Sequence, residues 1–575
     1  MIIKKNLNTL LSFLENKDRL NFYGIVILQF IGSLLEAFGI ALILPILAVI
    51  LGQQTSTFFF LNNIHEILNF SNKESLLILS IASMLLFFIF KNTILTLIYK
   101  KIFSFAYRIQ YKIKSKIYTH FINQRYHKFT EKGSSKLIST VSVDLNIFTQ
   151  NFLVAFLIFL TEIFVLLTIS ILLIIIEPSG FILVSFVTLI FVLVFMKLFK
   201  RKLNSLGEEK ENFEEKMQKI INDSLNSFQI TKIHNKENFF IDKFNLFNDK
   251  TSFLYGRFIF LQNIPRFFFE ILVIILLTIL VFTMIQFNYS YDEIFIKVAI
   301  FSAAAFRLMP SINRLTYTYQ SIVFSTSTLD NLYRLNKEIS SSIKEENLSE
   351  QSKNLEINFH NSLKMENILY KYEDKIILNN LNLEIKKGEA IGIYGMSGGG
   401  KTTLINLISG LTKPLKGNIF IDDKKIQIDN SSWQNLVGYV PQTTNLLDDT
   451  IINNITFCDE NVDQIFLEKI GKQAQILDLI KNHGDKNVGE RGLRMSGGQL
   501  QRVSIARALY KKPSILIFDE ATNALDEATE QKVFDTVYSL KGKVTLIIVS
   551  HNLDNLKQCD KKFKLEEGNL NEIEN

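Results

Sequence analysis

Long apolar stretches lie in the first 320 residues of the chain, and none lies in the last 220. A helix needs about 20 apolar residues to cross a hydrocarbon core of about 30 Å. Stretches of about this length occur at 21–51, 75–98, 148–176, 179–198, 268–288 and 293–318. Residues 178–196 and 271–291 contain no charged side chain and 145–176 contain only Glu162, so they are too apolar for the core helices of a soluble domain. The pattern predicts six transmembrane helices within residues 1–335.

The connections between these stretches differ in their content of Lys and Arg. Positions 100–140 carry ten and positions 200–266 carry twelve, whereas 52–74 carries only Lys73 and 288–293 carries none. Positively charged loops stay on the cytoplasmic side of a membrane. We therefore expect both termini and the two long loops in the cytoplasm, with the loops extending the helices by tens of Å.

The stretch 56–70 is apolar at roughly helical spacing but too short to span a membrane. It is equally consistent with a short amphipathic helix at the outer interface and with an apolar loop packed on the bundle. The first long apolar stretch begins after Lys17 and Arg19 and is followed by five more, so we do not expect a cleaved signal peptide.

A polar segment at 336–358, rich in Ser, Lys, Glu and Asn, separates the apolar part from residues 359–575. There the apolar run Ala390–Tyr394 leads into the glycine-rich sequence Gly395-Met396-Ser397-Gly398-Gly399-Gly400-Lys401-Thr402, and a helical pattern begins at Leu404. This order of strand, loop and helix predicts a phosphate-binding loop, because backbone N–H groups and a helix N-terminus then surround the phosphates. Lys401 is expected to pair with the β- and γ-phosphates and Thr402 to hold Mg²⁺.

Two further apolar runs end in side chains suited to phosphate chemistry. Ser514–Phe518 is followed by Asp519 and Glu520, and Val544–Val549 by Ser550 and His551. The carboxyl ends of parallel strands meet at one edge of a sheet, where such folds bind ligands. We expect Asp519 to reach Mg²⁺, Glu520 to act as the general base that polarises the attacking water, and His551 to lie beside the same edge.

The sequence Met495-Ser496-Gly497-Gly498-Gln499-Leu500-Gln501-Arg502 resembles the signature of ATP-binding cassette (ABC) proteins. Other motifs of that family accompany it in the family's order: Tyr372 resembles the aromatic residue that stacks on adenine, Gln442 the glutamine loop, Asp526 the D-loop and His551 the switch histidine. The family usually has Leu where this chain has Met495, a swap that conserves volume. The resemblance implies nucleotide contacts by Ser496, Gly498, Gln499 and Thr403, and a role for Gln442 in both catalysis and Mg²⁺ binding.

The resemblance covers essentially the whole chain, because one membrane part followed by one cassette is the arrangement of exporter half-transporters. It implies a polytopic α-helical membrane domain at 1–335, a linker at 336–358, and an α/β P-loop cassette at 359–575 that binds ATP and Mg²⁺. In that family the signature of one subunit covers the ATP held by the other, which implies a homodimer with twelve membrane helices. Gly489-Glu490-Arg491-Gly492 resembles the segment that contacts the partner's inner loop.

Composition excludes several other classes of protein. The chain is 48% hydrophobic and 21% charged, which excludes a disordered protein. Its two cysteines, Cys458 and Cys559, cannot form a disulfide framework or a cysteine-based zinc site. A peptide exporter with a cysteine-protease domain is not expected, since no cysteine precedes Cys458. We assign the net charge of +7 to the sorting of basic loops across a membrane and expect no nucleic-acid partner.

Ionisable side chains within the predicted spans each cost about 2.5–3.5 kcal/mol at the bilayer centre unless they meet water or a partner. They are Glu36, Glu162, Glu270, Lys297, Arg307 and Arg314. Arg307 and Arg314 are seven residues apart and share one helix face with Ser311. Because the guanidinium fork binds phosphate, this face predicts a cavity site for a phosphate or pyrophosphate headgroup. The alternative is that both side chains reach the inner interface or pair with Glu36 or Glu270.

The segment Phe306–Arg314, together with Lys91-Asn92 and the stretch 56–70, resembles the bacterial subfamily that flips lipid-linked oligosaccharides. The resemblance implies arginines that meet a pyrophosphate and an outer helix that meets the lipid tail. We therefore expect an ATP-driven flippase for a lipid-linked oligosaccharide or a similar anionic glycolipid in a bacterial cytoplasmic (inner) membrane. An exporter of peptides, drugs or other lipids is one alternative, and a membrane-anchored ATPase that transports nothing is another.

Overall fold

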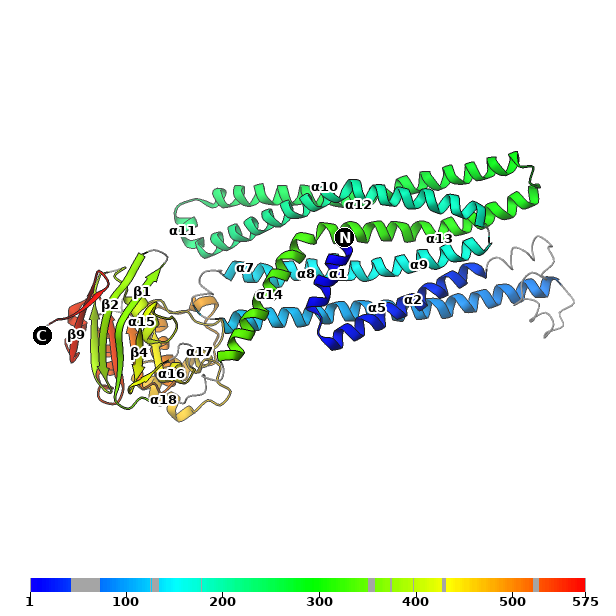
Figure 1. The fold of residues 1–575 in the computed structure, drawn as a ribbon. Coiled ribbons are helices and arrows are strands. Elements are labelled where there is room, and N and C mark those ends of the chain that lie inside the picture. The colour runs from blue at the N-terminus through cyan, green and yellow to red at the C-terminus, as the bar shows by residue number, and fades with distance from the viewer. Residues whose placement is uncertain are drawn as a thin grey trace. The chain divides into compact units, whose positions relative to one another are not determined.

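The computed structural model describes residues 2–42, 73–124, 126, 134–176, 178–349, 357–372, 375–396, 398–426, 431–520 and 527–573. The stretch 56–70, Ser397 and Asp526 lie outside the described residues, as do the side chains of Arg307 and Arg491. The chain divides into two compact units (Figure 1), one of residues 1–123 and 132–343 and one of residues 124–131 and 344–575.

The first unit is built from long helices. They are α1 (Ile2–Phe13), α2 (Asn16–Ala41), α5 (Lys73–Asn123), α7 (Ser134–Ser139), α8 (Leu145–Ile147), α9 (Ala155–Ile176), α10 (Pro178–Asn226), α11 (Phe228–Ile233), α12 (Glu237–Gln286), α13 (Tyr291–Phe324) and α14 (Thr326–Ser349). π-helical segments at Thr140–Asp144 and Phe148–Val154 join α7, α8 and α9 into one helical run. Each predicted span falls on one of these helices, the first as far as Ala41.

Four helical stretches among the described residues are long and apolar enough to cross a membrane: Asn16–Gly39, Ile81–Asn123, Leu137–Ile175 and Glu237–Gln286. The predicted fourth and sixth spans lie on α10 and α13, where several side chains are outside the description. Helix α5 has 51 residues and α12 has 50. At 1.5 Å per residue each is about 75 Å long, more than twice a hydrocarbon core. The helices therefore extend well beyond any membrane.

The long helices of the first unit pack in neighbouring pairs, with α10 beside α12, α9 beside α13, and α2 beside both α5 and α9 (Figure 1). Phe148, Phe152 and Phe156 lie four residues apart and stack at centroid distances of 5.6 and 6.1 Å in the shared core. Outward-facing side chains such as Leu86 and Phe282 are apolar as well. A helix that is apolar all round suits a lipid environment.

Helix α14 runs into the segment predicted as a linker. Its bounds, Thr326–Ser349, include the first fourteen positions of 336–358. Leu329, Leu332 and Ile339 are buried in the core of the first unit, and their spacing of three and seven residues places them on one helix face. The polar composition of residues 336–349 predicts a linker, but packing of this buried face holds them in a helix.

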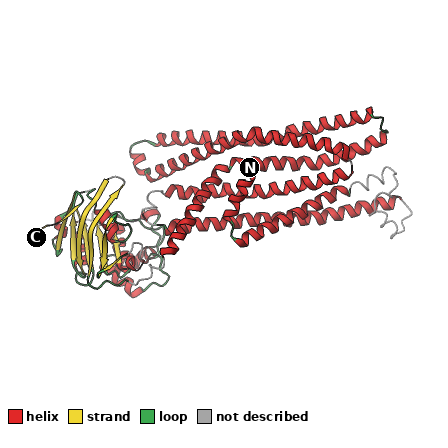
Figure 2. Ribbon diagram, in the orientation of Figure 1, coloured by secondary structure: helices red, strands yellow, loops and turns green. Residues whose placement is uncertain are grey.

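The second unit contains two sheets (Figure 2). Its strands are β1 (Ser362–Tyr372), β2 (Lys375–Lys386), β3 (Ala390–Tyr394), β4 (Lys416–Ile421), β5 (Lys424–Lys425), β6 (Val437–Val440), β7 (Ile515–Asp519), β8 (Thr545–Ser550), β9 (Lys561–Glu566) and β10 (Asn569–Ile573). Its helices are α15 (Lys401–Ile408), α16 (Ser431–Leu436), α17 (Ile451–Thr456), α18 (Gln464–Gln473), α19 (Leu477–His483), α20 (Gly497–Tyr510) and α21 (Glu527–Tyr538). One sheet is antiparallel with the order β2-β1-β4-β5, and the other is mostly parallel with the order β10-β9-β3-β8-β7-β6.

The parallel sheet is covered on both faces, which explains why its strands are continuous apolar runs. Every residue of β7 and β8 is buried. Ile515 and Ile517 enter the core that contains α15, whereas Leu516 and Phe518 enter the core that contains α20 and α21. This alternation is the two-residue period of a strand. The carboxyl ends of β3, β7 and β8 lie at one edge of the sheet.

Candidate functional site

The glycine-rich loop joins β3 to α15. Gly398 and Gly400 have φ of 81° and 98°, a backbone conformation that favours glycine. A Cβ on Gly395 would lie 2.6 Å from the carbonyl oxygen of Leu565, so a side chain there would displace one strand end. Only small residues allow the backbone to turn this closely before α15 begins at Lys401.

The Lys401 side chain is buried and bridges the loop to β7. Its Nζ donates to the carbonyl oxygen of Gly395 at 2.7 Å and forms an ion pair with Glu520 Oε1 at 2.7 Å. Thr402 and Thr403 follow in the first turn of α15, with Thr402 exposed. The cation predicted for phosphate is therefore neutralised by a carboxylate in this structure.

Asp519 ends β7 and is almost fully buried. Burial raises the pKa of its carboxyl, and the neighbouring Glu520 raises it further. The Tyr439 hydroxyl donates to Asp519 Oδ2 at 3.1 Å. The sequence motifs did not indicate this partner, although Tyr439 lies near the end of β6, the strand that pairs with β7. The one available signal was that β6 and β7, if paired, would bring Tyr439 and Asp519 near the same edge of the sheet.

Glu520 follows β7 with φ of 47°, an uncommon conformation for a residue with a side chain. Its N–H donates to the carbonyl oxygen of Val549 at 3.0 Å, which ties it to the end of β8. Gln442 Nε2 donates to Glu520 Oε2 at 2.8 Å, and Nδ1 of the exposed His551 lies 4.0 Å from the same oxygen. The structure thus brings Lys401, Gln442, Glu520 and His551 together.

The signature segment begins α20, and two of its residues form hydrogen bonds with each other at the start of the helix. Ser496 Oγ accepts from the N–H of Gln499 at 3.3 Å, and Gln499 Oε1 accepts from the N–H of Ser496 at 3.0 Å, which is a capping box. Arg502 donates to the carbonyl oxygen of Gly498. Within the described residues, this segment forms no hydrogen bond or ion pair with the side chains around Glu520. Tyr372, at the end of β1, pairs with Lys375 of β2 and is 65% exposed.

The side chains at this edge fit a nucleotide with Mg²⁺. Mg²⁺ is usually held by one or two carboxylates together with substrate phosphates and water. Asp519 supplies a carboxylate, and Thr402 and Gln442 supply neutral oxygens. The described part of the chain contains no group of three or more His, Cys, Asp or Glu side chains that could hold a metal ion by itself. A site that shares its ion with phosphates needs no such group.

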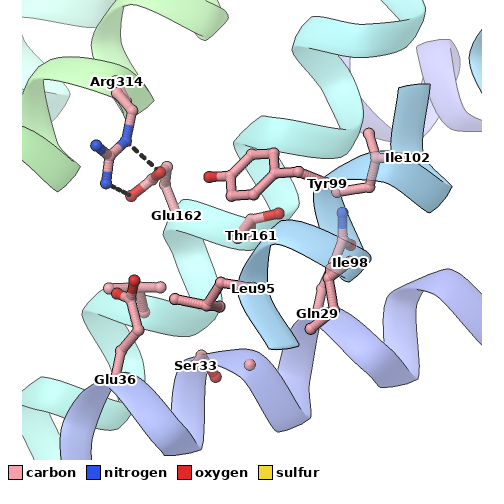
Figure 3. A pocket seen from close by; sticks show the side chains of 12 residues that line it. Gln29, Ser33, Glu36, Leu95, Ile98, Tyr99, Ile102, Thr161, Glu162 and Arg314 are labelled. Carbon is pink, nitrogen blue, oxygen red and sulfur yellow. Dashed lines mark hydrogen bonds and ion pairs between the residues drawn. The ribbon is translucent and has the colours of Figure 1, made fainter. Parts of the chain in front are cut away.

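A second polar site lies within the helical unit (Figure 3). Arg314 of α13 faces Glu162 of α9, with Nε 2.5 Å from Oε1 and Nη2 3.3 Å from Oε2. The alternative expectation was that the arginines pair with Glu36 or Glu270, whereas Arg314 pairs with Glu162. The side chain of Arg307 lies outside the described residues. Glu270 instead pairs with Arg266, four residues earlier on α12, at 3.0 Å. The partner depends on how α9 and α13 are rotated against each other, which spacing along the chain does not determine.

Lys91 of α5 is a further cation within the helices predicted to span. It is 6% exposed, and its Nζ lies 4.2 Å from the ring centroid of Phe88. Lys91 forms no ion pair within the described part of the chain. A buried cation without a carboxylate is costly in a membrane and is a candidate for function.

Comparison with known proteins agrees with both parts of the fold. The model described as "ABC transporter transmembrane region" matches residues 22–307, and that described as "ABC transporter" matches residues 378–523. The chain is 41% identical over 216 residues to "ABC transporter B family member 29, chloroplastic" of Arabidopsis thaliana, covering 36% of this chain and 34% of that protein. It is 39% identical over 213 residues to an "ATP-dependent lipid A-core flippase" of Syntrophus aciditrophicus, covering 36% and 35%. The alignments thus span about a third of these relatives.

A solved structure extends the likeness to nearly the whole chain. The structure of a bacterial Atm1-family ABC exporter with ATP bound has a TM-score of 0.76 and 19% sequence identity, and the match covers 97% of this chain and 95% of that one. At this identity the likeness establishes the fold. Since the two family models match consecutive parts of a chain with this fold, the chain belongs to the ABC transporters, as an exporter half-transporter with one transmembrane region fused to one ATP-binding cassette.

Proposed function

We propose that the chain hydrolyses ATP to move an amphipathic substrate across a membrane. The observation that carries this proposal is the meeting of Lys401, Gln442, Glu520 and His551 at one sheet edge beside a glycine loop. A general base, a phosphate-pairing cation and orienting side chains are the parts that phosphoryl transfer to water requires. Their attachment to membrane helices couples the reaction to transport.

The contacts support the following roles at the ATP site. Lys401 leaves Glu520 and pairs with the phosphates, and Glu520 then accepts a proton from the attacking water. Gln442 and His551 orient the groups around that water. Asp519, Thr402 and Gln442 would hold Mg²⁺, which would neutralise charge on the phosphates.

The active form is proposed to be a homodimer. The hydrogen bonds of Ser496 and Gln499 join these two residues to each other, and among the described residues neither bonds to Glu520 or its partners. The signature of a second copy then covers each ATP. This arrangement supplies two equivalent sites and twelve membrane helices.

The substrate is proposed to be a lipid-linked oligosaccharide or another lipid with an anionic headgroup. Buried Lys91 and the partly exposed Arg314 support this choice, because cations within membrane helices attract phosphate groups. Arg307 lies seven residues before Arg314 on α13, and we assign it the same role. The lipid A-core flippase among the relatives is named for a lipid substrate.

The protein is proposed to lie in a bacterial cytoplasmic membrane with both termini in the cytoplasm. The distribution of charge supports this orientation. The connection within 200–266 carries twelve Lys and Arg, whereas 288–293 carries none.

Reconstitution tests the proposed substrate. The purified chain is placed in vesicles with a fluorescent polyprenyl-pyrophosphate-linked glycan, and exposure of the glycan to an impermeant quencher is followed after ATP addition. Arg314→Ala is expected to slow flipping at least about tenfold, since a hydrogen bond to a charged group contributes about 1.5–3 kcal/mol. Arg307→Ala is expected to act in the same direction. Arg257→Ala, an exposed arginine on α12 outside the predicted span, is the matched control.

The outcomes separate the alternatives. Equal flipping by Arg314→Ala and Arg257→Ala contradicts the assignment of Arg314 to the headgroup. Transport of a peptide or drug without flipping of the glycan lipid favours a general exporter. ATP turnover with no transport of any of them favours a membrane-anchored ATPase.

A further inference from the structure

The Arg314–Glu162 pair is asymmetric in its exposure. The Glu162 side chain is 1% exposed, whereas that of Arg314 is 43% exposed. Both carboxylate oxygens are engaged by the guanidinium fork (Figure 3). A ligand in the bundle can therefore approach the arginine without first reaching the carboxylate.

The pair leaves little room for a third charged group. The cavity beside it has a volume of about 10 Å³, roughly the least that holds one water molecule. Its lining comes from four helices and includes Glu36 of α2 and Tyr99 of α5, besides Glu162 and Arg314. Among the described residues, the lining contains no second cation for Glu162. Glu162 occupies the Nε and Nη2 donors of Arg314, so an anion that binds this same pair of donors must displace Glu162.

We propose that Glu162 is a specificity-determining residue that occupies Arg314 until an anionic headgroup replaces it. This inference rests on the proposed binding of the headgroup by Arg314. The phosphodiester of a zwitterionic lipid carries one negative charge, equal to that of the carboxylate, and a monophosphate carries about 1.5–2 near pH 7, so both gain less than a pyrophosphate by the exchange. A pyrophosphate carries more charge and more acceptor oxygens, so it takes the fork from Glu162. The built-in competitor thereby favours pyrophosphate lipids over monophosphate and zwitterionic lipids.

Binding to the purified full-length chain in lipid nanodiscs tests this inference. The probes are radiolabelled polyprenyl pyrophosphate and polyprenyl monophosphate, each titrated to equilibrium. Glu162→Gln removes the competing charge at nearly constant volume. It is expected to bind both probes about tenfold more tightly, with the larger gain for the monophosphate, so that the preference for pyrophosphate falls.

Three variants complete the test. Glu162→Asp keeps the charge and is expected to retain the preference for pyrophosphate, which guards against a fold defect in Glu162→Gln. Glu270 pairs with Arg266 within α12, away from the Arg314–Glu162 pair. Glu270→Gln is therefore expected to leave both affinities unchanged. Arg314→Ala is expected to lose binding of both probes.

The results distinguish this inference from the function it rests on. If wild type binds, Arg314→Ala does not, and Glu162→Gln keeps the wild-type affinities and preference, Glu162 is not a competitor although the headgroup site stands. If Arg314→Ala binds as well as wild type, the headgroup site itself is wrong and the inference falls with it.

Discussion

Glu520 is the residue on which the proposed ATP chemistry depends. Its backbone is left-handed, and its two carboxylate oxygens are held by different partners, Lys401 on one and Gln442 on the other. A nucleotide that recruits Lys401 frees one oxygen while Gln442 still orients the other. The same contacts that restrain the carboxylate in this structure therefore prepare it to act as a base.

Glu520→Gln is expected to reduce ATP turnover by about 10²-fold or more, the usual contribution of a general base. Binding of ATP is expected to persist, because the phosphate loop is unchanged. Steady-state phosphate release and equilibrium binding of ATP measure the two effects on one preparation. Glu567→Gln is a suitable control, since Glu567 is an exposed carboxylate that also has a positive φ. Nearly normal hydrolysis by Glu520→Gln would assign the base elsewhere.

At the scale of elements, one carboxylate joins the start of β1 to the end of β4. Asp422 accepts hydrogen bonds from the N–H groups of His360, Asn361 and Ser362 at 2.6, 2.6 and 2.9 Å. Burial alone raises the pKa of this carboxyl, but the three N–H groups outweigh burial and hold the pKa below its ordinary value. A carboxyl with a lowered pKa stabilises the fold above the pKa of the unfolded chain, and this stability is lost as pH falls through the folded pKa.

Asp422→Asn is expected to lower the free energy of unfolding of the cassette by about 1 kcal/mol at neutral pH. The difference from wild type should shrink as pH falls from about 4, the ordinary pKa of Asp in an unfolded chain, through the lower pKa of the folded carboxyl. The single tryptophan, Trp433, is 1% exposed in the cassette core, so its fluorescence during denaturant unfolding reports on this unit. Asp423→Asn changes the exposed neighbour and serves as control. An equal loss in both variants, or a loss that does not depend on pH, would contradict the role of Asp422.

Strands were predictable from the sequence where burial on both faces makes a continuous apolar run. The runs Ala390–Tyr394, Ser514–Phe518 and Val544–Val549 lie within one residue of β3, β7 and β8, because a strand covered on both faces is apolar throughout. Helix α14 was less visible, since its buried face is narrow and its other faces are polar.

Contacts between elements were less predictable than the elements. Motif order indicated that the Glu520 edge would assemble, because strand ends of one sheet must meet. It did not indicate that Tyr439 would bond Asp519 or that Lys401 would pair with Glu520. The Arg314–Glu162 pair depends on helix rotation, which periodicity constrains only to within a face.

At the scale of the whole molecule, the central claim is that two copies share each ATP. Under this claim the phosphate loop and the signature of one chain each supply half of a site, and the side chains of Ser496 and Gln499 are engaged by each other's N–H groups. On this proposal, closing two cassettes on ATP moves the helices attached to them. This claim requires that every functional site combine Lys401 of one copy with Ser496 of the other.

Mixing two inactive variants tests the shared site most directly. Lys401→Ala removes the phosphate cation, and Ser496→Arg blocks the signature, so each variant alone is expected to lose ATP hydrolysis. A mixed dimer contains one site in which the intact loop of one chain meets the intact signature of the other. ATPase measured after the two purified variants are mixed and allowed to exchange subunits is therefore expected to exceed that of either variant. A mixture as inactive as its components, or full activity in either variant alone, would contradict the account.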